Sequence, residues 1–201
     1  MVNKKFIISN GASKIILAST SPRRKQLLEM LEGNFKVVDS GYKEVIRPHL
    51  GVSGVVKFLA LGKAKAAAKQ HPNSIIIAAD TVVELGGKIL GKPHTAAKAK
   101  VMLKQLSGKA HYIFTGVAVI NAATGQEFLG VDKVKVVFRK LSDEEINSYV
   151  ATKEPLDRAG AYALQGIGFK LIKEINGDLT TAIGLPMSLV YNGLQQLGIK
   201  H

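Results

Sequence analysis

The stretch IILASTSPRR, residues 15–24, decides the fold class because it joins a strand-like segment directly to a helix start. Its four apolar residues form a short buried strand, and Ser21 followed by Pro22 is typical of an N-cap and the first helical position. The unpaired amides of that first turn, the positive end of the helix dipole and the guanidinium groups of Arg23 and Arg24 would face one place. The stretch therefore indicates an anion site, although a capped helix with two solvated arginines would look the same.

The rest of the chain alternates between strand-like and helix-like stretches, which is the pattern of an α/β protein. The expected strands are residues 15–18, 35–39, 74–80, 112–121, 127–138 and 169–175, with a hairpin over residues 81–90. The expected helices are residues 22–32, 53–70, 95–106, 142–151 and 186–197. Residues 1–13 are expected to form an N-terminal extension, which leaves residues 14–201 as a single domain.

The composition is that of an ordinary globular chain with a strong positive charge. Lys and Arg number 28 against 15 Asp and Glu, and the net charge of +13 attracts a nucleotide, a nucleic acid or an anionic lipid alike. An aromatic content of 6% without Trp argues against a base-stacking surface for single strands. The absence of Cys excludes disulfides, thiolate catalysis and Cys-based zinc sites. No apolar run is long enough for a membrane span or a signal peptide, so we expect a cytoplasmic protein.

The strongest candidate for catalysis is Asp80, which we expect at the carboxyl end of the buried strand 74–80, where open α/β sheets bind their ligands. An aspartate that merely terminates the strand is the alternative. Thr81 follows it, and Lys92 stands between a glycine and a proline, which hold its backbone stiffly enough to place a charge on a phosphate. Lys63 falls on the apolar side of its helix, and a buried lysine needs a partner.

Further polar residues in loops have two interpretations each. Glu44 is either a solvated loop residue or part of a site, and Glu154 with Asp157 could either help to coordinate a hard divalent cation or support their own loop. Gln165 carries a donor and an acceptor on one planar group and could read a base edge. His111 is expected to be a residue at a strand start rather than a metal ligand, because no second His lies at a suitable spacing.

These segments, taken in order along the chain, resemble the Maf family. The resemblance rests on Ser19–Arg24 with Leu27–Leu28, Ala79–Val83, Gly91–Pro93, Leu106–Gly108, Glu154–Gly166, Ile175–Asp178 and Gly184–Pro186. Arg158 departs from the pattern, because the family more often has Lys there. The implied fold is a mixed twisted sheet with helices on both sides, in which two lobes flank a nucleotide cleft.

The resemblance implies a nucleoside triphosphate pyrophosphatase that splits the α,β-phosphate link with the help of Mg²⁺ or Mn²⁺ and acts as a homodimer. It assigns Asp80 as the proton acceptor for water and as a metal ligand together with Glu44. Substrate binding falls on seven positions, of which Arg23, Thr81 and Gln165 govern substrate choice: Ser19, Arg23, Arg24, Lys63, Thr81, Lys92 and Gln165. The Asp-Thr pair and the late Gln are similar to the branch that acts on dTTP and UTP rather than on 7-methyl-GTP.

Two other functions remain compatible with the residues. A basic protein that binds nucleic acid or regulates cell division, without catalysis, would use the positive surface alone. That function would need no Asp80. For a pyrophosphatase, neither a specific nucleic-acid partner nor a membrane is expected. A purine triphosphatase of the ITP type would share the phosphate chemistry and differ in its base pocket.

Overall fold

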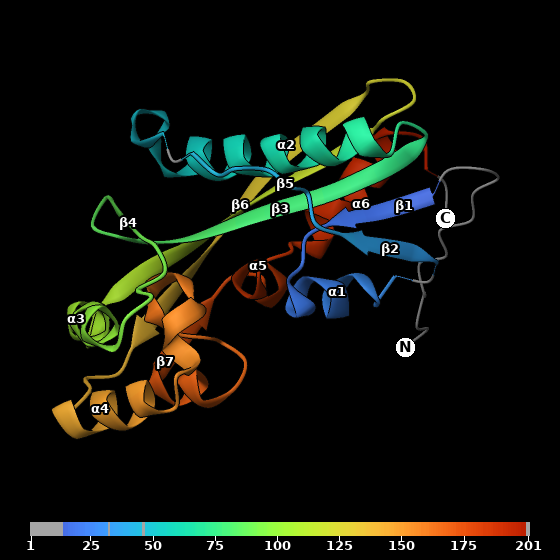
Figure 1. The fold of residues 1–201 in the computed structure, drawn as a ribbon. Helices are drawn as coiled ribbons and strands as arrows, with labels where there is room; N and C mark the ends of the chain where they lie inside the picture. The colour runs from blue at the N-terminus through green and yellow to red at the C-terminus, as the bar shows by residue number, and fades with distance from the viewer. Residues whose placement is uncertain (1–13, 32, 46, 200–201) are drawn as a thin grey trace. The chain divides into compact units, whose positions relative to one another are not determined.

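The computed structural model describes residues 14–31, 33–45 and 47–199 and has an α/β architecture built on a twisted sheet of seven strands (Figure 1). The strands are β1 (Lys14–Ala18), β2 (Phe35–Val38), β3 (Ser74–Leu85), β4 (Lys88–Leu90), β5 (Ala110–Asn121), β6 (Glu127–Phe138) and β7 (Ile172–Asn176). Their order is β2-β1-β3-β5-β6-β7, and β4 pairs with β3. The predicted mixed sheet is confirmed, because β1 runs parallel to β2 and β3, whereas β3 pairs antiparallel with β4 and β6 with β7.

The α-helices connect these strands and flank the sheet. They are α1 (Pro22–Leu28), α2 (Gly51–Gln70), α3 (Ala96–Leu106), α4 (Asp143–Ala151), α5 (Leu179–Ile183) and α6 (Met187–Gln196). Single 3₁₀ turns add η1 (Pro48–Leu50), η2 (Glu154–Asp157), η3 (Ala159–Ala161) and η4 (Ile167–Leu171). Within the described ranges, no helix is both long and apolar enough to cross a membrane.

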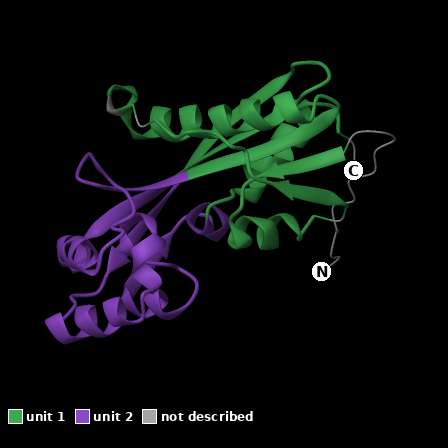
Figure 2. Cartoon of the chain, in the orientation of Figure 1, with its two compact units in different colours: residues 1–80, 115–132, 184–201 green, residues 81–114, 133–183 purple. Residues whose placement is uncertain are grey.

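The chain divides into two compact units, which Figure 2 colours separately. Unit 1 comprises residues up to 80 together with residues 115–132 and 184–201, and unit 2 comprises residues 81–114 and 133–183. The long strands β3, β5 and β6 contribute residues to both units. The expected extension, residues 1–13, lies outside the described residues, and the single domain over residues 14–201 stays a prediction.

Unit 1 has a strand-and-helix core that follows the predicted alternation. Ile15 of β1 pairs with β2 on one side and with β3 on the other, so β1 is buried among neighbours. Ala118 of β5 packs with the alanine-rich face of α2. The next residue, Val119, points to the opposite side and lies against α6, where a Cβ added to Gly193 would be 2.7 Å from Cγ2 of Val119. The strands of this unit are therefore covered on both faces, as Figure 1 shows for α2 and α6.

Unit 2 is organised around α3, α4 and the ends of β5 and β6. The predicted capping box of α4 is confirmed: Ser142 accepts from the amide of Glu145, whose carboxylate accepts from the amide of Ser142. His111 is buried and its Nε2 lies 2.7 Å from the hydroxyl of Tyr162, with Phe138 edge-on to the imidazole. Burial lowers the pKa of His111 to about 4, which agrees with the predicted structural role.

Several expected boundaries are wrong. Strand β3 does not end at Asp80 but continues to Leu85, because residues 83–85 pair antiparallel with β4 across the confirmed Gly86-Gly87 turn. Strand β7 begins at Ile172 rather than at residue 169, since residues 167–171 form a 3₁₀ turn. Helix α1 ends at Leu28 rather than near residue 32, and α5 was not expected.

Candidate active site

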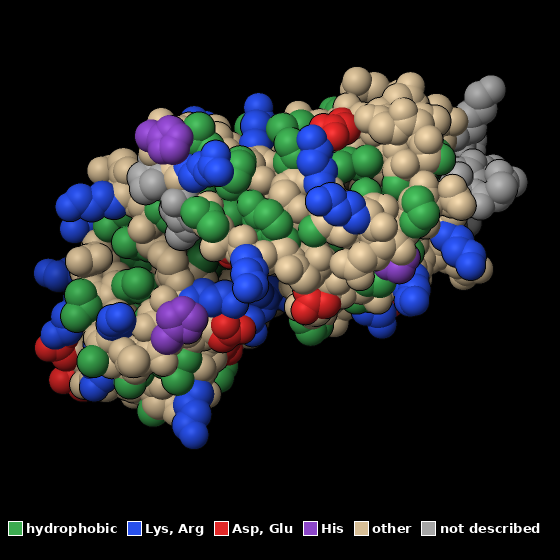
Figure 3. Space-filling model, turned by 45° about the horizontal axis from the view of Figure 1, so that its top comes forward, with side chains coloured by type: hydrophobic (Ala, Val, Ile, Leu, Met, Phe, Trp, Pro, Cys, Tyr) green, Lys and Arg blue, Asp and Glu red, His purple; other side chains and the backbone are tan. Residues whose placement is uncertain are grey.

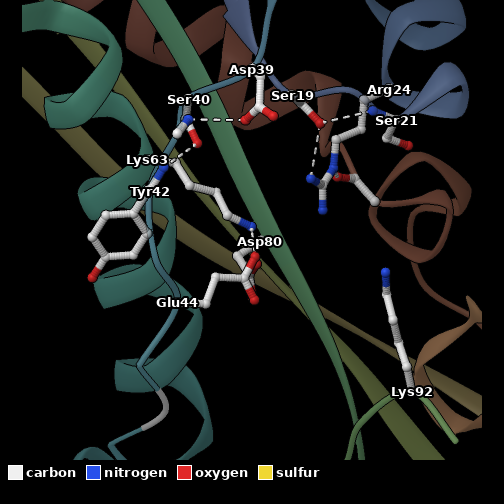
Figure 4. A network of polar contacts seen from close by, with 12 residues as sticks. Ser19, Ser21, Arg24, Asp39, Ser40, Tyr42, Glu44, Lys63, Asp80 and Lys92 are labelled. Atoms are coloured by element: carbon white, nitrogen blue, oxygen red, sulfur yellow. Dashed lines mark hydrogen bonds and ion pairs between the residues drawn. The ribbon is translucent and has the colours of Figure 1, made fainter. Parts of the chain in front are cut away.

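The turn after β1 is organised by the hydroxyl of Ser19. It accepts hydrogen bonds from the amide of Ser21 (3.3 Å) and from Nη1 of Arg24 (3.2 Å), while Nε of Arg24 donates to the carbonyl of Gly184 (2.8 Å) (Figure 4). The two bonds that Arg24 donates hold its guanidinium group in one orientation, and the amide of Ser21 helps to fix the Ser19 hydroxyl that accepts one of them. The predicted N-cap position of Ser21 and the proline at the helix start are confirmed, but the Ser21 side chain makes no capping hydrogen bond.

A second group of charges lies on α2, β3 and the loop after β2. The Lys63 ammonium is 2.5 Å from Oδ1 of Asp80 and 2.7 Å from Oε1 of Glu44, and Figure 4 shows the Lys63 side chain pointing towards the two carboxylates. The side chains of Lys63 and Asp80 are 12% and 9% exposed, whereas that of Glu44 is 53% exposed. Lys63 is thus largely buried and paired with carboxylates, as its place on the apolar side of the helix predicts.

Asp80 occupies its position because the parallel part of the sheet stops just before it. The last register pair between β1 and β3 joins Leu17 to Ile77, so Asp80 lies three residues beyond the paired end of β1. The carboxylate is thus inside a strand, yet it stands at the carboxyl edge of the parallel strands, where α/β sheets bind ligands. This is why the expected location was correct although the expected strand end was wrong.

The electrostatic setting of Asp80 combines burial with two nearby cations. Burial raises its pKa above the ordinary value, and the positive charges of Lys63 and Arg24 oppose that rise without cancelling it. Burial likewise lowers the pKa of Arg24, against the attraction of Asp80 and Glu44. A carboxylate whose charged form is disfavoured has a greater tendency to take up a proton, which is what a general base requires.

The carboxylates of Asp80 and Glu44 supply some of the oxygen ligands that a hard divalent cation needs. Asp80 and Glu44 already surround one positive charge with carboxylate oxygens, which are the ligands that Mg²⁺ and Mn²⁺ prefer. Among the residues that the structure describes, no group of three His, Cys, Asp or Glu side chains is placed to hold a metal ion. A cation bound here would need further oxygen ligands, such as those of a phosphate.

The remaining predicted residues belong to other local environments. Arg23 lies half-buried on α1 in unit 1. Thr81 continues β3 in unit 2, and in the same unit Nζ of Lys92 pairs with Oδ1 of Asp157 at 2.7 Å between two exposed side chains. Gln165 lies exposed in a loop of unit 2. Their joint action on one substrate stays a prediction.

Sequence reasoning missed one functional group in unit 1. The carbonyl of Gly184 holds Arg24 across a separation of 160 residues, and a backbone carbonyl carries no side-chain signature. The segment Gly184–Pro186 drew attention only as part of the family resemblance.

The chain is similar to known proteins in sequence and in fold. A dTTP/UTP pyrophosphatase of Bacillus mycoides (strain KBAB4) is 45% identical over 183 residues, covering 91% of this chain and 95% of the relative. A dTTP/UTP pyrophosphatase of Bacillus cytotoxicus is 45% identical over 190 residues, covering 94% and 98%. The solved structure of a HAM1 protein from Coxiella burnetii has a TM-score of 0.50 at 15% identity, covers 92% of this chain and 96% of its own, and supports the fold alone.

The family comparison spans nearly the whole described chain. The profile described as Maf-like protein matches residues 14–197, which include every candidate residue from Ser19 to Gln165. With that match and relatives at 45% identity over more than nine-tenths of its length, the chain belongs to the Maf family.

Proposed function

We propose that this chain is a nucleoside triphosphate pyrophosphatase that hydrolyses dTTP and UTP to the monophosphate and pyrophosphate. The names of its relatives support the reaction and the choice of base. The observation that carries the proposal is the buried Asp80 with a raised pKa, held by Lys63 and facing the charge of Arg24. Such a carboxylate beside fixed cations combines a proton acceptor with groups that stabilise negative phosphate oxygens.

The reaction begins with the activation of water. Asp80 accepts a proton from a water molecule, whose oxygen attacks the α-phosphorus. The bond between the α-phosphorus and the oxygen that bridges it to the β-phosphorus breaks, and pyrophosphate leaves. Arg24, whose guanidinium group is oriented by Ser19 and Gly184, offers a fixed positive charge to oxygens that gain charge in the transition state.

The proposal includes a divalent cation. Glu44 and Asp80 would hold Mg²⁺ or Mn²⁺ together with phosphate oxygens, and the bound ion would neutralise charge on the phosphates. Lys63 contacts both carboxylates, so its positive charge offsets theirs when the cation is absent, and its ammonium group can turn towards a phosphate when the cation is bound.

Choice of substrate is assigned to Arg23, Thr81 and Gln165, and Lys92 is assigned to phosphate binding. Uracil and thymine both present an N–H flanked by two carbonyls, which a carboxamide such as that of Gln165 can pair with. Cytosine presents an amino donor and a ring-nitrogen acceptor instead, so a carboxamide held in one orientation would discriminate against CTP.

A non-catalytic polyanion-binding protein explains the structure less well. Figure 3 shows Lys and Arg side chains in several separate places on the face in view. Binding a polyanion through these charges would require neither a buried Asp80 nor a largely buried lysine paired with it.

The test is pyrophosphate release from dTTP, UTP, CTP, GTP, 7-methyl-GTP and ITP with Mg²⁺ or Mn²⁺ and after chelation. We expect release from dTTP and UTP that requires the cation and falls by about 10²–10⁴-fold in Asp80→Asn. Asp143→Asn, which changes an exposed aspartate on α4, is the matched control and should retain full activity. Preferred release from ITP would favour the purine alternative, and no release from any nucleotide would refute the proposal.

A further inference from the structure

Two side chains of unit 2, those of Tyr149 and Glu154, accept hydrogen bonds from the backbone of the Gln165 loop both before and after Gln165. On the preceding side, the amide of Ala163 donates to the hydroxyl of Tyr149 at 3.2 Å. That hydroxyl in turn donates to Oε1 of Glu154 at 2.9 Å. Tyr149 comes from α4 and Glu154 opens η2, so two packed elements support the loop from outside it.

On the following side, the Glu154 carboxylate accepts two backbone amides. Oε2 accepts from Ile167 at 3.2 Å, and Oε1 accepts from Gly168 at 3.1 Å. Together with the Tyr149 hydroxyl, one carboxylate therefore receives three donors, and both of its oxygens are used. These three hydrogen bonds favour loop support over metal ligation as the role of Glu154.

The glycines on either side of Ile167 allow this close approach. Gly166 has φ of +107°, a conformation that L side chains rarely adopt, and a Cβ there would lie 2.9 Å from Oε2 of Glu154. A Cβ on Gly168 would lie 2.5 Å from the hydroxyl of Tyr149. The backbone of the loop thus rests directly on the two supporting side chains.

We propose that Glu154 and Tyr149 are positioning residues that present the exposed carboxamide of Gln165 to the pyrimidine base. The inference rests on the proposed function, in which Gln165 reads the base. An exposed side chain on a glycine-rich loop would otherwise sample many orientations, and ordering it would weaken binding. Anchoring the backbone on both sides of Gln165 removes much of that ordering cost before the nucleotide arrives.

The test compares Glu154→Gln with Glu144→Gln, the same change at an exposed position on α4. In Glu154→Gln, the new carboxamide at position 154 keeps one acceptor oxygen and replaces the other by an NH₂ donor, which then faces the hydrogen of a backbone amide. We expect KM for UTP to rise about 3–10-fold and the preference for UTP over CTP to fall by a similar factor. The kcat for UTP should stay within about twofold, because Asp80 and its neighbours are unchanged.

Tyr149→Phe provides a second variant, which removes the hydroxyl and keeps the ring. It should shift KM and base preference in the same direction, and the double variant should lose less than the two single variants combined. In hydrogen exchange, the amides of Ile167 and Gly168 should exchange faster in Glu154→Gln and unchanged in Glu144→Gln.

The outcomes separate this inference from the proposed function. If the wild type releases pyrophosphate from UTP and Gln165→Ala abolishes the preference for UTP over CTP, but both positioning variants keep that preference, the inference is overturned. Unchanged exchange at Ile167 and Gly168 in Glu154→Gln overturns it as well. Wild-type protein that turns over no pyrimidine triphosphate refutes the proposed function, and with it the assignment of a pyrimidine to this loop, whatever the exchange shows.

Discussion

Replacing Lys63 by Met removes the cation between two carboxylates while keeping a long side chain on the buried side of α2. Lys63 Nζ lies 2.5 Å from Asp80 Oδ1 and 2.7 Å from Glu44 Oε1, so these two oxygens can be no farther apart than about 5 Å. Two unit charges at about 5 Å repel by about 3 kcal/mol at an effective dielectric constant of about 20 and by about 1 kcal/mol in bulk water.

The net loss of stability follows from weighing this repulsion against burial. The variant loses the attraction of Lys63 to Asp80, but it also no longer buries an ammonium group, and these two effects largely offset each other. The exposure of Glu44, 53% of its side chain, moves the repulsion towards the value in water. We therefore expect the free energy of unfolding to fall by about 1–3 kcal/mol in metal-free protein.

Urea denaturation in EDTA at about pH 7.5 measures this loss, with Lys65→Met as the control. Lys65 lies two residues further on α2 and pairs with Glu127 at 3.0 Å on the exposed side, so its loss should cost less than about 1 kcal/mol. Equal losses in the two variants would refute the reasoning.

The pH dependence gives a second check on Lys63→Met. Because the folded pKa of Asp80 is raised, ionisation of this group destabilises the protein as the pH rises from the unfolded pKa to the folded pKa. Loss of Lys63 raises that folded pKa further. The stability gap between Lys63→Met and the wild type should therefore shrink when the pH is lowered to about 5, where more of the variant's Asp80 is protonated. A gap that widens would contradict the assignment of Asp80 as the repelling group.

Three other substitutions separate structural from functional roles. Asp157→Asn removes the exposed partner of Lys92 and should change the free energy of unfolding by less than about 1 kcal/mol. In steady-state assays the released Lys92 ammonium should lower KM for UTP, and a higher KM would contradict the assignment of Lys92 to phosphate binding. Gly116→Ala places a Cβ 2.5 Å from the carbonyl oxygen of Val56 in α2, so urea denaturation should show that the free energy of unfolding falls by about 1–3 kcal/mol. An unchanged free energy of unfolding would contradict this close approach. Ser142→Ala breaks the capping box of α4, so thermal unfolding should show that the free energy of unfolding falls by about 0.5–2 kcal/mol, while kcat for UTP stays unchanged.

The parts of the site that could be predicted from the sequence are those with a local signature. Helical spacing placed Lys63 on the apolar side of α2, and the cost of burying a lone ammonium required an acid opposite it, which proved to be Asp80. The capping box and the glycine turn of the β3–β4 hairpin are likewise local, and they were found where expected.

Features without a local signature could not be predicted. The sequence indicated a strand over residues 74–80 followed by a hairpin over residues 81–90, but not that the two join without a break into the single strand β3. The pattern around Glu154 is the same for a metal ligand and for a loop support. Only the positions of Tyr149, Ile167 and Gly168 around its carboxylate distinguish the two.

The buried carboxylate of Asp80 lowers the stability of the folded protein. It lies in β3 after Ala78 and Ala79, both fully buried, where a neutral side chain would avoid the cost of burying a charge. We therefore expect Asp80→Asn to reduce the free energy of unfolding less than Lys63→Met does, or even to increase it, because the first removes a disfavoured carboxylate and the second leaves two carboxylates facing each other. Urea denaturation of both variants in EDTA provides the comparison. A larger loss in Asp80→Asn would mean that the carboxylate is a structural partner of Lys63 and Arg24 first, and its burial would no longer indicate catalysis.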